Sequence, residues 1–233
     1  MTDRSGGVLV TGGTGALGQW VVKAYADAGE TVHVTWQTEK ELHRLETFLG
    51  EAFSSLRLHR ADVASESEVE EVFEAVAEDG GLRASVHIVG GFAWASLADT
   101  DPATWESMLR MNATSCFLCC RAAAARMGET GGRLVNVAAV PALDRGAAMM
   151  SAYSASKAAV LNLTQSLAKE LAPRRITVNA IVPTIIDTPA NRKAMPDADT
   201  STWLPPAEIA KVISFLTGPD ARILTGAALT LSL

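Results

Sequence analysis

A glycine-rich turn constrains the fold of this chain more than any other feature of the sequence. Residues 8–11 form a short apolar segment that ends in the sequence GGTGALG, and residues from about 16 to 28 carry helical periodicity before Gly29 ends it. Glycines in this context allow a tight turn and let the amides of a helix N-terminus approach a pyrophosphate. The order of strand, glycine turn and helix therefore predicts the first unit of a dinucleotide-binding fold.

The rest of the chain continues the alternation of strands and helices. We expect further strands at residues 31–36, 56–59, 85–89, 134–138, 176–182 and about 227–231. We expect helices at residues 39–49, 66–77, about 102–110, about 112–127, about 150–171 and 206–216. This pattern predicts an α/β Rossmann fold, a doubly wound parallel sheet of about seven strands flanked by helices, with ligands at the carboxyl ends of the strands. No linker interrupts it, so residues 1–233 should form a single domain.

Composition and charge exclude several classes of protein. With 48% hydrophobic and 20% charged residues, the chain can bury a sizeable core. The net charge is −6 and lysines and arginines are scattered, so no nucleic-acid partner is expected. No apolar run approaches the roughly 20 residues that cross a bilayer, and none precedes the glycine turn, so we expect no membrane partner and a cytoplasmic protein. Cys116, Cys119 and Cys120 lie together without a second ligand pair, which predicts buried, reduced thiols and no metal site.

The predicted cofactor contacts begin at the glycine turn and continue after later strands. The turn itself supplies Gly12, Gly13, Thr14, Gly15, Ala16 and Leu17. Asp62, beside Val63 after the third strand, is able to accept a hydrogen bond from an adenine amino group, although a carboxylate there can equally cap the next helix. Gly90 and Gly91, after the fourth strand, would let the backbone pass close to a ribose, or would form only a turn.

The end of the second strand bears on the choice between NAD(H) and NADP(H). A carboxylate about 20 residues after the glycines binds the ribose 2′-hydroxyl of NAD(H). Residues 34–38 have the sequence VTWQT, and the first acid, Glu39, already lies in the helical segment. A 2′-phosphate would meet no repulsion there, and Gln37, Thr38 and Lys40 are candidate contacts, but no arginine stands at the strand end. The sequence therefore favours NADP(H) slightly over NAD(H).

Tyr153 and Lys157 form the predicted chemical centre. They are spaced i, i+4 at the start of a helix, so their side chains share one face. A neighbouring ammonium favours the phenolate and should lower the tyrosine pKa from its usual value of about 10, so that Tyr153 can protonate a carbonyl oxygen as hydride arrives. The spacing by itself is common, and a surface tyrosine over a lysine stem would also produce it.

Several motifs together resemble the short-chain dehydrogenase/reductase family in their order and spacing over nearly the full length. They are TGGTGALG, ADV, Asn112, RLVNVAA, YSASK and VPTIIDTP. The resemblance implies that Tyr153, Lys157 and Asn112 are catalytic, with Asn112 helping to hold a water chain to the lysine. It also implies that Thr188 meets the nicotinamide carboxamide and that Pro183 contacts the cofactor. Dimeric and tetrameric family members suggest a homodimer or homotetramer that packs through the helices at 112–127 and 150–171.

Three departures from the family pattern are similar to one branch, the quinoid dihydropteridine reductases. Alanine stands at the active-site serine position, Ala139, and Ala138 and Val140 beside it supply no hydroxyl. Ala16 replaces the middle glycine of the turn, and residues 88–91 have the sequence IVGG in place of asparagine, alanine and glycine. The loop DTPANRKAMPDAD at residues 187–199, followed by a tryptophan, also resembles that branch. The branch carries an acid after the second strand, which this sequence lacks.

These observations predict an NAD(P)H-dependent oxidoreductase that transfers hydride to a C=O or conjugated C=N acceptor, with dihydropteridine-like quinonoids as the leading substrates. Such an acceptor is activated, so the hydrogen-bond donor lost at Ala139 matters less than it would for an isolated ketone. The alternatives are a generic carbonyl reductase or alcohol dehydrogenase, and a catalytically weakened nucleotide-binding sensor. A loop at about 184–205 should close over the substrate, and Trp94, Asn191 and Trp203 are weak candidate contacts beside Ala139. Ordinary packing explains the two tryptophans equally well.

Overall fold

A seven-stranded parallel sheet organises the molecule, with the strand order β3-β2-β1-β4-β5-β6-β7. The computed structural model describes residues 6–143 and 146–233. The strands are β1 Gly7–Thr11, β2 Val32–Trp36, β3 Arg57–Arg60, β4 Leu82–His87, β5 Gly132–Val137, β6 Ile176–Pro183 and β7 Ala228–Leu231. Strand order, number and direction confirm the predicted doubly wound sheet.

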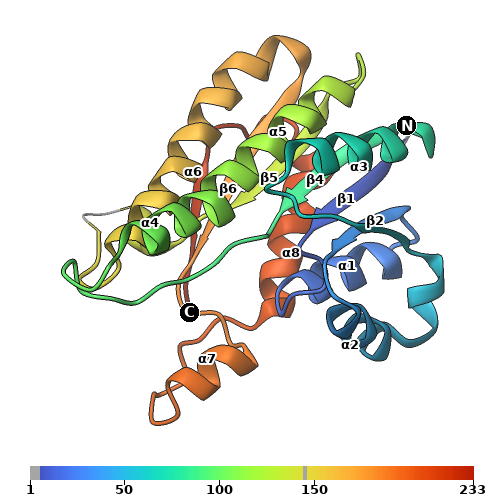
Figure 1. The fold of residues 1–233 in the computed structure, drawn as a ribbon. Helices are drawn as coiled ribbons and strands as arrows, with labels where there is room; N and C mark the ends of the chain where they lie inside the picture. The colour runs from blue at the N-terminus through green and yellow to red at the C-terminus, as the bar shows by residue number, and fades with distance from the viewer. Residues whose placement is uncertain (1–5, 144–145) are drawn as a thin grey trace.

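Helices cover both faces of this sheet, which gives three layers (Figure 1). The α-helices are α1 Gly18–Asp27, α2 Glu39–Leu49, α3 Glu66–Glu78, α4 Pro102–Met108, α5 Ser115–Arg126, α6 Ser151–Leu171, α7 Pro189–Ala194 and α8 Pro206–Thr217. Shorter helical segments are η1 Gly50–Ser55, η2 Leu109–Thr114, η3 Val140–Ala142, η4 Ala172–Arg174 and η5 Pro219–Ala221. Within the described residues, no helix is both long and apolar enough to span a bilayer.

The two faces of the sheet bury separate apolar clusters because strand side chains alternate between faces. One cluster lies under α3, α5 and α6 and includes Phe73, Leu134 and Val178. The other lies under α1, α2 and α8 and includes Val10, Val34 and Ile213. Every residue of β6 is buried, as expected for a strand covered on both faces.

Three predicted elements differ in the structure. The fourth strand begins at Leu82 and ends at His87, so the loop toward the glycines starts two residues earlier than expected. The two helices expected at 102–110 and 112–127 form one continuous helical segment, because the turn at Leu109–Thr114 is π-helical. Neither glycine nor proline occurs between residues 109 and 114, so nothing in that stretch ends the helix. The loop at 184–205 contains an additional short helix, α7.

The strand order reverses between β1 and β4, which lie side by side although β2 and β3 separate them in sequence. In open α/β sheets the crevice at such a reversal, beyond the carboxyl ends of the strands, is where ligands bind. The glycine turn after β1, the glycines after β4 and the loop after β6 all lie at this edge.

Candidate active site at the carboxyl edge of the sheet

The glycine turn is held so tightly that side chains would not fit at several positions. A Cβ on Gly18 would collide with the carbonyl oxygen of Gly12, and a Cβ on Gly13 would lie 2.6 Å from Val34 Cγ1. Gly12 itself has φ +69°, in the left-handed region, and the Gly15 amide donates to its carbonyl oxygen at 3.0 Å. The close approach of α1 to β1 is therefore built into the sequence, and it leaves the turn open to a pyrophosphate.

An arginine lies beside this turn although none stands at the end of β2. Arg44 projects from α2, and its Nη2 donates to the carbonyl oxygen of Thr14 at 2.7 Å. Because α2 begins just after β2, this contact joins the glycine turn to the helix that follows β2. Sequence analysis missed it, since Arg44 is six residues beyond Thr38, the N-cap of α2, and only the helix brings it back.

Asp62 follows β3 and does not cap α3, whose N-cap residue is Ser65. Asp62 Oδ1 accepts from the Ala64 amide at 2.9 Å, a local turn at the start of the loop before α3. The same carboxylate accepts from Gln37 Nε2 at 3.4 Å and forms an ion pair with Arg110 at 2.6 Å. Two predicted cofactor residues, Gln37 and Asp62, therefore lie together beside the glycine turn.

Asn112 connects the loop after β4 to helix α6. It is 1% exposed and lies in the π-helical turn η2. Its Oδ1 accepts from the Gly91 amide at 3.0 Å, and its Nδ2 donates to the Gly91 carbonyl oxygen at 3.1 Å and to Ser156 Oγ at 3.0 Å. A Cβ on Gly90 would lie 2.6 Å from Asn112 Oδ1 and 3.1 Å from Lys157 Nζ. Gly90 thus lets Asn112 and Lys157 approach the backbone, a stronger requirement than a simple turn.

Tyr153 and Lys157 lie one turn apart on α6, at the same edge of the sheet. Lys157 is buried, and its Nζ donates to the Val137 carbonyl oxygen at 2.8 Å. The Tyr153 ring makes an edge contact with Phe92, with ring centroids 5.0 Å apart. Lys157 therefore lies beneath the site, while Tyr153 faces its mouth.

Burial displaces the pKa values of both residues. It raises the pKa of Tyr153 to about 12 and lowers the pKa of Lys157 to about 8. The expected lowering of the tyrosine pKa by the lysine is therefore wrong for this state of the protein, because loss of hydration outweighs the neighbouring charge. A tyrosine with this pKa keeps its proton at neutral pH, which suits a proton donor.

The position of the family's serine offers no hydroxyl. Ala139 is 6% exposed, lies two residues after the end of β5 and is the N-cap residue of the short helix η3. A different hydroxyl, Thr184 Oγ1 after β6, is buried and has no hydrogen-bond partner among the described residues. Sequence analysis missed Thr184, because a threonine in a loop carries no signal until its burial is known.

The loop after β6 is tied down by its own polar side chains. Thr188 Oγ1 accepts from the Asn191 amide at 3.1 Å and caps α7, while Pro183 ends β6. Asn191 Nδ2 donates to the Ile186 carbonyl oxygen at 2.8 Å, and Arg192 forms an ion pair with Asp187 at 2.6 Å. Asn191 therefore braces the loop in this structure.

The two tryptophans proposed as substrate contacts have opposite environments. Trp203 is 4% exposed and lies within the packed base of the loop, so its ring offers no face for stacking here. Trp94 is 62% exposed and follows Phe92 in the loop after β4. Phe92, two residues before Trp94, supplies aromatic surface in contact with Tyr153.

The three cysteines are free and buried, as predicted. Cys116 and Cys120 lie with His87 in a group whose ligand atoms are within 4.8 Å of one another. His87 is hydrogen-bonded through both ring nitrogens, Nε2 to Ser85 Oγ and Nδ1 to Asn136 Oδ1, each at 2.8 Å. These bonds satisfy the imidazole within the core, and a metal ion would have to break one of them.

Comparisons with known proteins identify the family. Residues 13–232 match the family model described as enoyl-(acyl carrier protein) reductase. The chain is 33% identical over 197 residues to a 3beta-hydroxysteroid dehydrogenase of Mediterraneibacter gnavus, which covers 83% of this chain and 70% of that protein. It is 32% identical over 237 residues to a D-threitol dehydrogenase of Mycolicibacterium smegmatis, which covers 96% of this chain and 90% of that protein. The chain belongs to the short-chain dehydrogenase/reductase family.

Solved structures of the short-chain dehydrogenase/reductase family agree with this assignment. A doubly substituted short-chain dehydrogenase/reductase of Serratia marcescens superposes with a TM-score of 0.87 at 26% identity, covering 97% of this chain and 96% of that chain. A variant of the actinorhodin polyketide ketoreductase with NADPH superposes with a TM-score of 0.87 at 27% identity, covering 99% and 97%. The chain is thus a short-chain dehydrogenase/reductase oxidoreductase with the family's fold. The relatives named here lend no support to a particular closeness to dihydropteridine reductases.

Proposed function

We propose that this chain reduces a C=O or conjugated C=N acceptor with a nicotinamide cofactor. The observation that carries the proposal is the grouping of Tyr153, Lys157 and Asn112 at the carboxyl edge of the sheet, next to the glycine turn. A nucleotide-binding sensor would require the turn alone. The buried Lys157 one turn from Tyr153 supplies an acid–base pair that nucleotide binding alone does not need.

The residues at this edge fit a dinucleotide. The turn from Gly12 to Leu17 would hold the pyrophosphate, and the buried, unpartnered Thr184 hydroxyl is a donor for the nicotinamide end near Thr188. Arg44 beside the turn supports NADP(H) over NAD(H), since its cation can approach a 2′-phosphate. When bound, the nicotinamide supplies the hydride.

The residues of the chain provide the proton and the electrostatic support. Tyr153, protonated at neutral pH, donates to the substrate atom that gains negative charge. Proton donation leaves a phenolate on Tyr153. Lys157, held by the Val137 carbonyl oxygen, stabilises this phenolate when the lysine is protonated. Asn112 positions the loop after β4 and the start of α6 relative to one another.

Ala139 and the aromatic mouth bear on the class of substrate. The family's active site has two hydroxyl donors to the substrate, a serine and a tyrosine. Because Ala139 replaces the serine, Tyr153 is the remaining donor, which favours acceptors whose developing negative charge needs less stabilisation. The exposed Phe92 against Tyr153, with the exposed Trp94 in the same loop, favours a flat, conjugated ring, and a dihydropteridine-like quinonoid has both properties. The second candidate is a simple ketone or its alcohol, which the names of the hydroxysteroid and threitol dehydrogenases favour.

The deciding measurement is oxidation of NADPH and NADH by the purified protein against quinonoid dihydropterin and a panel of ketones and aldehydes. Tyr153→Phe should abolish turnover and leave cofactor binding, measured by fluorescence titration, unchanged. Turnover limited to ketones would support the second candidate. Tight cofactor binding with no turnover of any substrate would contradict the proposed enzyme, as would full activity of Tyr153→Phe.

We also propose that the protein is cytoplasmic and assembles as a homodimer or homotetramer through α5 and α6. The exposed Phe117 on α5 and the row of exposed small and polar residues on α6 support this interface.

A further inference from the structure

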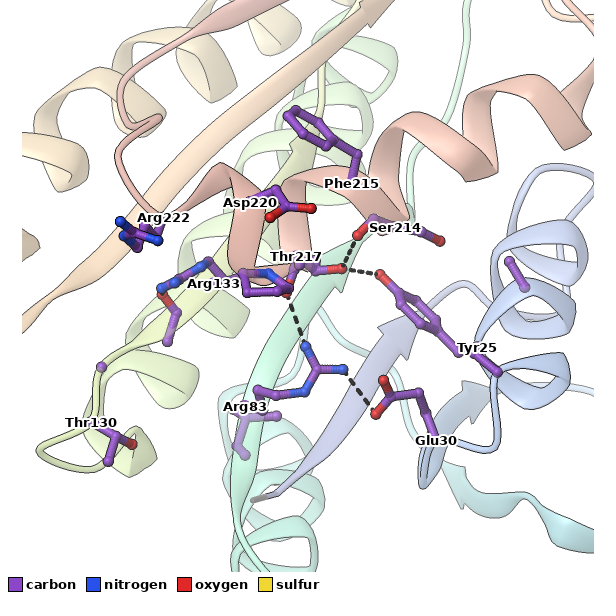
Figure 2. Close-up of a pocket in the computed structure, with 17 residues that line it drawn as sticks. Tyr25, Glu30, Arg83, Thr130, Arg133, Ser214, Phe215, Thr217, Asp220 and Arg222 are labelled. Carbon is purple, nitrogen blue, oxygen red and sulfur yellow. Dashed lines mark hydrogen bonds and ion pairs between the residues drawn. The ribbon is translucent and has the colours of Figure 1, made fainter. Parts of the chain in front are cut away.

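A cavity lies at the opposite edge of the sheet from the candidate active site (Figure 2). Its volume is about 620 Å³, and the amino ends of β4 and β5, the end of α1 and the segment after α8 enclose it. Three arginines from three different elements line it: Arg83 from β4, Arg133 from β5 and Arg222 after η5. Neither the cofactor nor the substrate proposed above reaches this edge.

Arg83 lines the cavity because the sheet is irregular at this point. β1 and β4 pair Gly7 with Leu82 but Val8 with Ala84, so Arg83 is an extra residue in the register. Such a bulge re-aims a side chain. Leu82 remains in the cluster under α3 and α5, while Arg83 turns toward the end of α8, where Nη1 donates to the Thr217 carbonyl oxygen at 2.9 Å.

Arg133 approaches the same space from the neighbouring strand with fewer partners. Its Nη1 donates to the Gly132 carbonyl oxygen at 2.9 Å. Its Nε is buried and has no hydrogen-bond partner among the described residues, and the same holds for Arg83 Nε and Ser214 Oγ. Burial and repulsion from Arg83 lower the pKa of Arg133. Donors that are buried without acceptors are costly, and here two of them belong to cations.

The carboxylates nearby do not account for these donors. Glu30 forms an ion pair with Arg83 (Figure 2). The distance from Glu30 Oε2 to Arg83 Nη2 is 3.0 Å. Asp220 lines the cavity but is exposed, and within residues 6–143 and 146–233 it forms no ion pair. Three arginines therefore share one space with two carboxylates, one of them already paired.

We propose that this cavity is a binding site for a small oxyanion, the phosphate or carboxylate group of a metabolite, with Arg133, Arg83 and Ser214 as donors and Arg222 at its mouth. An oxyanion accepts several charge-assisted hydrogen bonds and neutralises the excess cation. The site lies away from Tyr153, so its ligand is not the substrate of the proposed reduction.

The test is isothermal titration calorimetry of the full chain with inorganic phosphate, pyrophosphate and citrate, which separates phosphate from carboxylate ligands. Arg133→Gln should weaken binding of the preferred anion by about tenfold or more, and Arg222→Gln by less. Lys211→Gln is the matched control, since it removes one exposed cation of α8 outside the cavity and should leave binding unchanged. Turnover of NADPH, unaltered in all three variants, reports that each is folded.

Three outcomes would overturn the proposal. One is that no anion binds the unaltered protein. Another is that anions bind equally well to Arg133→Gln, because they would then occupy the glycine turn or another site. The third is that Arg133→Gln and Arg222→Gln change the oligomeric state in light scattering without any anion binding, which would make the cavity a contact between copies of this chain. Arg222 is exposed, so its variant folds even where a change at Arg133 disturbs the strand.

Discussion

Lys157 is the residue whose chemistry depends most on its surroundings. A lysine amine ordinarily keeps its proton well beyond neutral pH, but burial lowers the pKa of Lys157 to about 8. Tyr153 shifts the other way, to about 12, so it remains protonated wherever Lys157 titrates. At pH values below the pKa of Tyr153, therefore, only the lysine of this pair changes its charge.

This difference predicts the pH dependence of the reduction. Lys157 is cationic below about 8 and loses its charge above it, so kcat/KM should be level at lower pH and fall by about tenfold per pH unit beyond that point. Steady-state rates from pH 6 to about 10 check this, with Lys157→Met expected to lose both the activity and the break in the profile. A profile that stays level up to about pH 10 would contradict the assigned role.

Arg44 is the residue that distinguishes the two cofactors in the proposed complex. Its guanidinium reaches Thr14 in the glycine turn from α2. Arg44→Gln should raise the KM for NADPH by about tenfold and leave that for NADH nearly unchanged, because a charge-assisted bond to the 2′-phosphate would be lost. Lys23→Gln on α1, where the lysine pairs with Asp27, is the control. Equal changes for both cofactors would show that Arg44 only supports the turn.

At the residue scale, the sequence predicts which residues carry the chemistry better than it predicts the burial and contacts of each side chain. The spacing of Tyr153 and Lys157 and the glycines of the turn are local patterns, and the structure brings them to one edge. Whether Trp203 is exposed, or whether Asn191 points to its own loop, depends on tertiary packing that no local pattern reports.

Among the secondary-structure elements, the π-helical turn Leu109–Thr114 matters most to the site. A π turn inserts one residue into a helix and is frequent at functional sites. Here the turn contains Asn112, whose side-chain amide joins the loop after β4, at Gly91, to the start of α6, at Ser156. Among the described residues, no other side chain of η2 forms hydrogen bonds to both segments. The sequence pattern predicted two helices on either side of this turn, and the structure joins them because the π turn continues the helical backbone.

Asn112→Ala should therefore affect both stability and catalysis. The change leaves the Gly91 amide and carbonyl without their side-chain partner, and Ser156 Oγ keeps only its bond to the Tyr153 carbonyl oxygen, which should cost about 1–3 kcal/mol in the free energy of unfolding. It should also lower kcat, since the loop after β4 and the start of α6 lose their common support. Urea unfolding and steady-state kinetics check both, with the exposed Asn162→Ala on α6 as control. An unchanged free energy of unfolding would mean that the Asn112 hydrogen bonds do not stabilise the fold.

For the whole molecule, the alternation of strands and helices was enough to predict the parallel sheet, its covered faces and the ligand edge. Parallel strands with right-handed crossovers leave few arrangements for this pattern. What the pattern does not contain is the extra residue at Arg83, because a bulge changes the register between β1 and β4 without changing either strand's apolar pattern. The arginine cavity at the amino edge was consequently not predicted.

Assembly is the remaining question at this scale, and two exposed aromatic residues test it. Phe117 on α5 is 44% exposed, and Phe215 on α8 is 50% exposed on another part of the surface. Phe117→Glu should dissociate the proposed α5 and α6 interface, because a charge buried between copies lacks a partner. Phe215→Glu should leave a dimer intact, and it should change a tetramer only where α8 forms a second interface. Multi-angle light scattering measures each species, and an unaltered protein that is monomeric at micromolar concentration would contradict the proposed assembly.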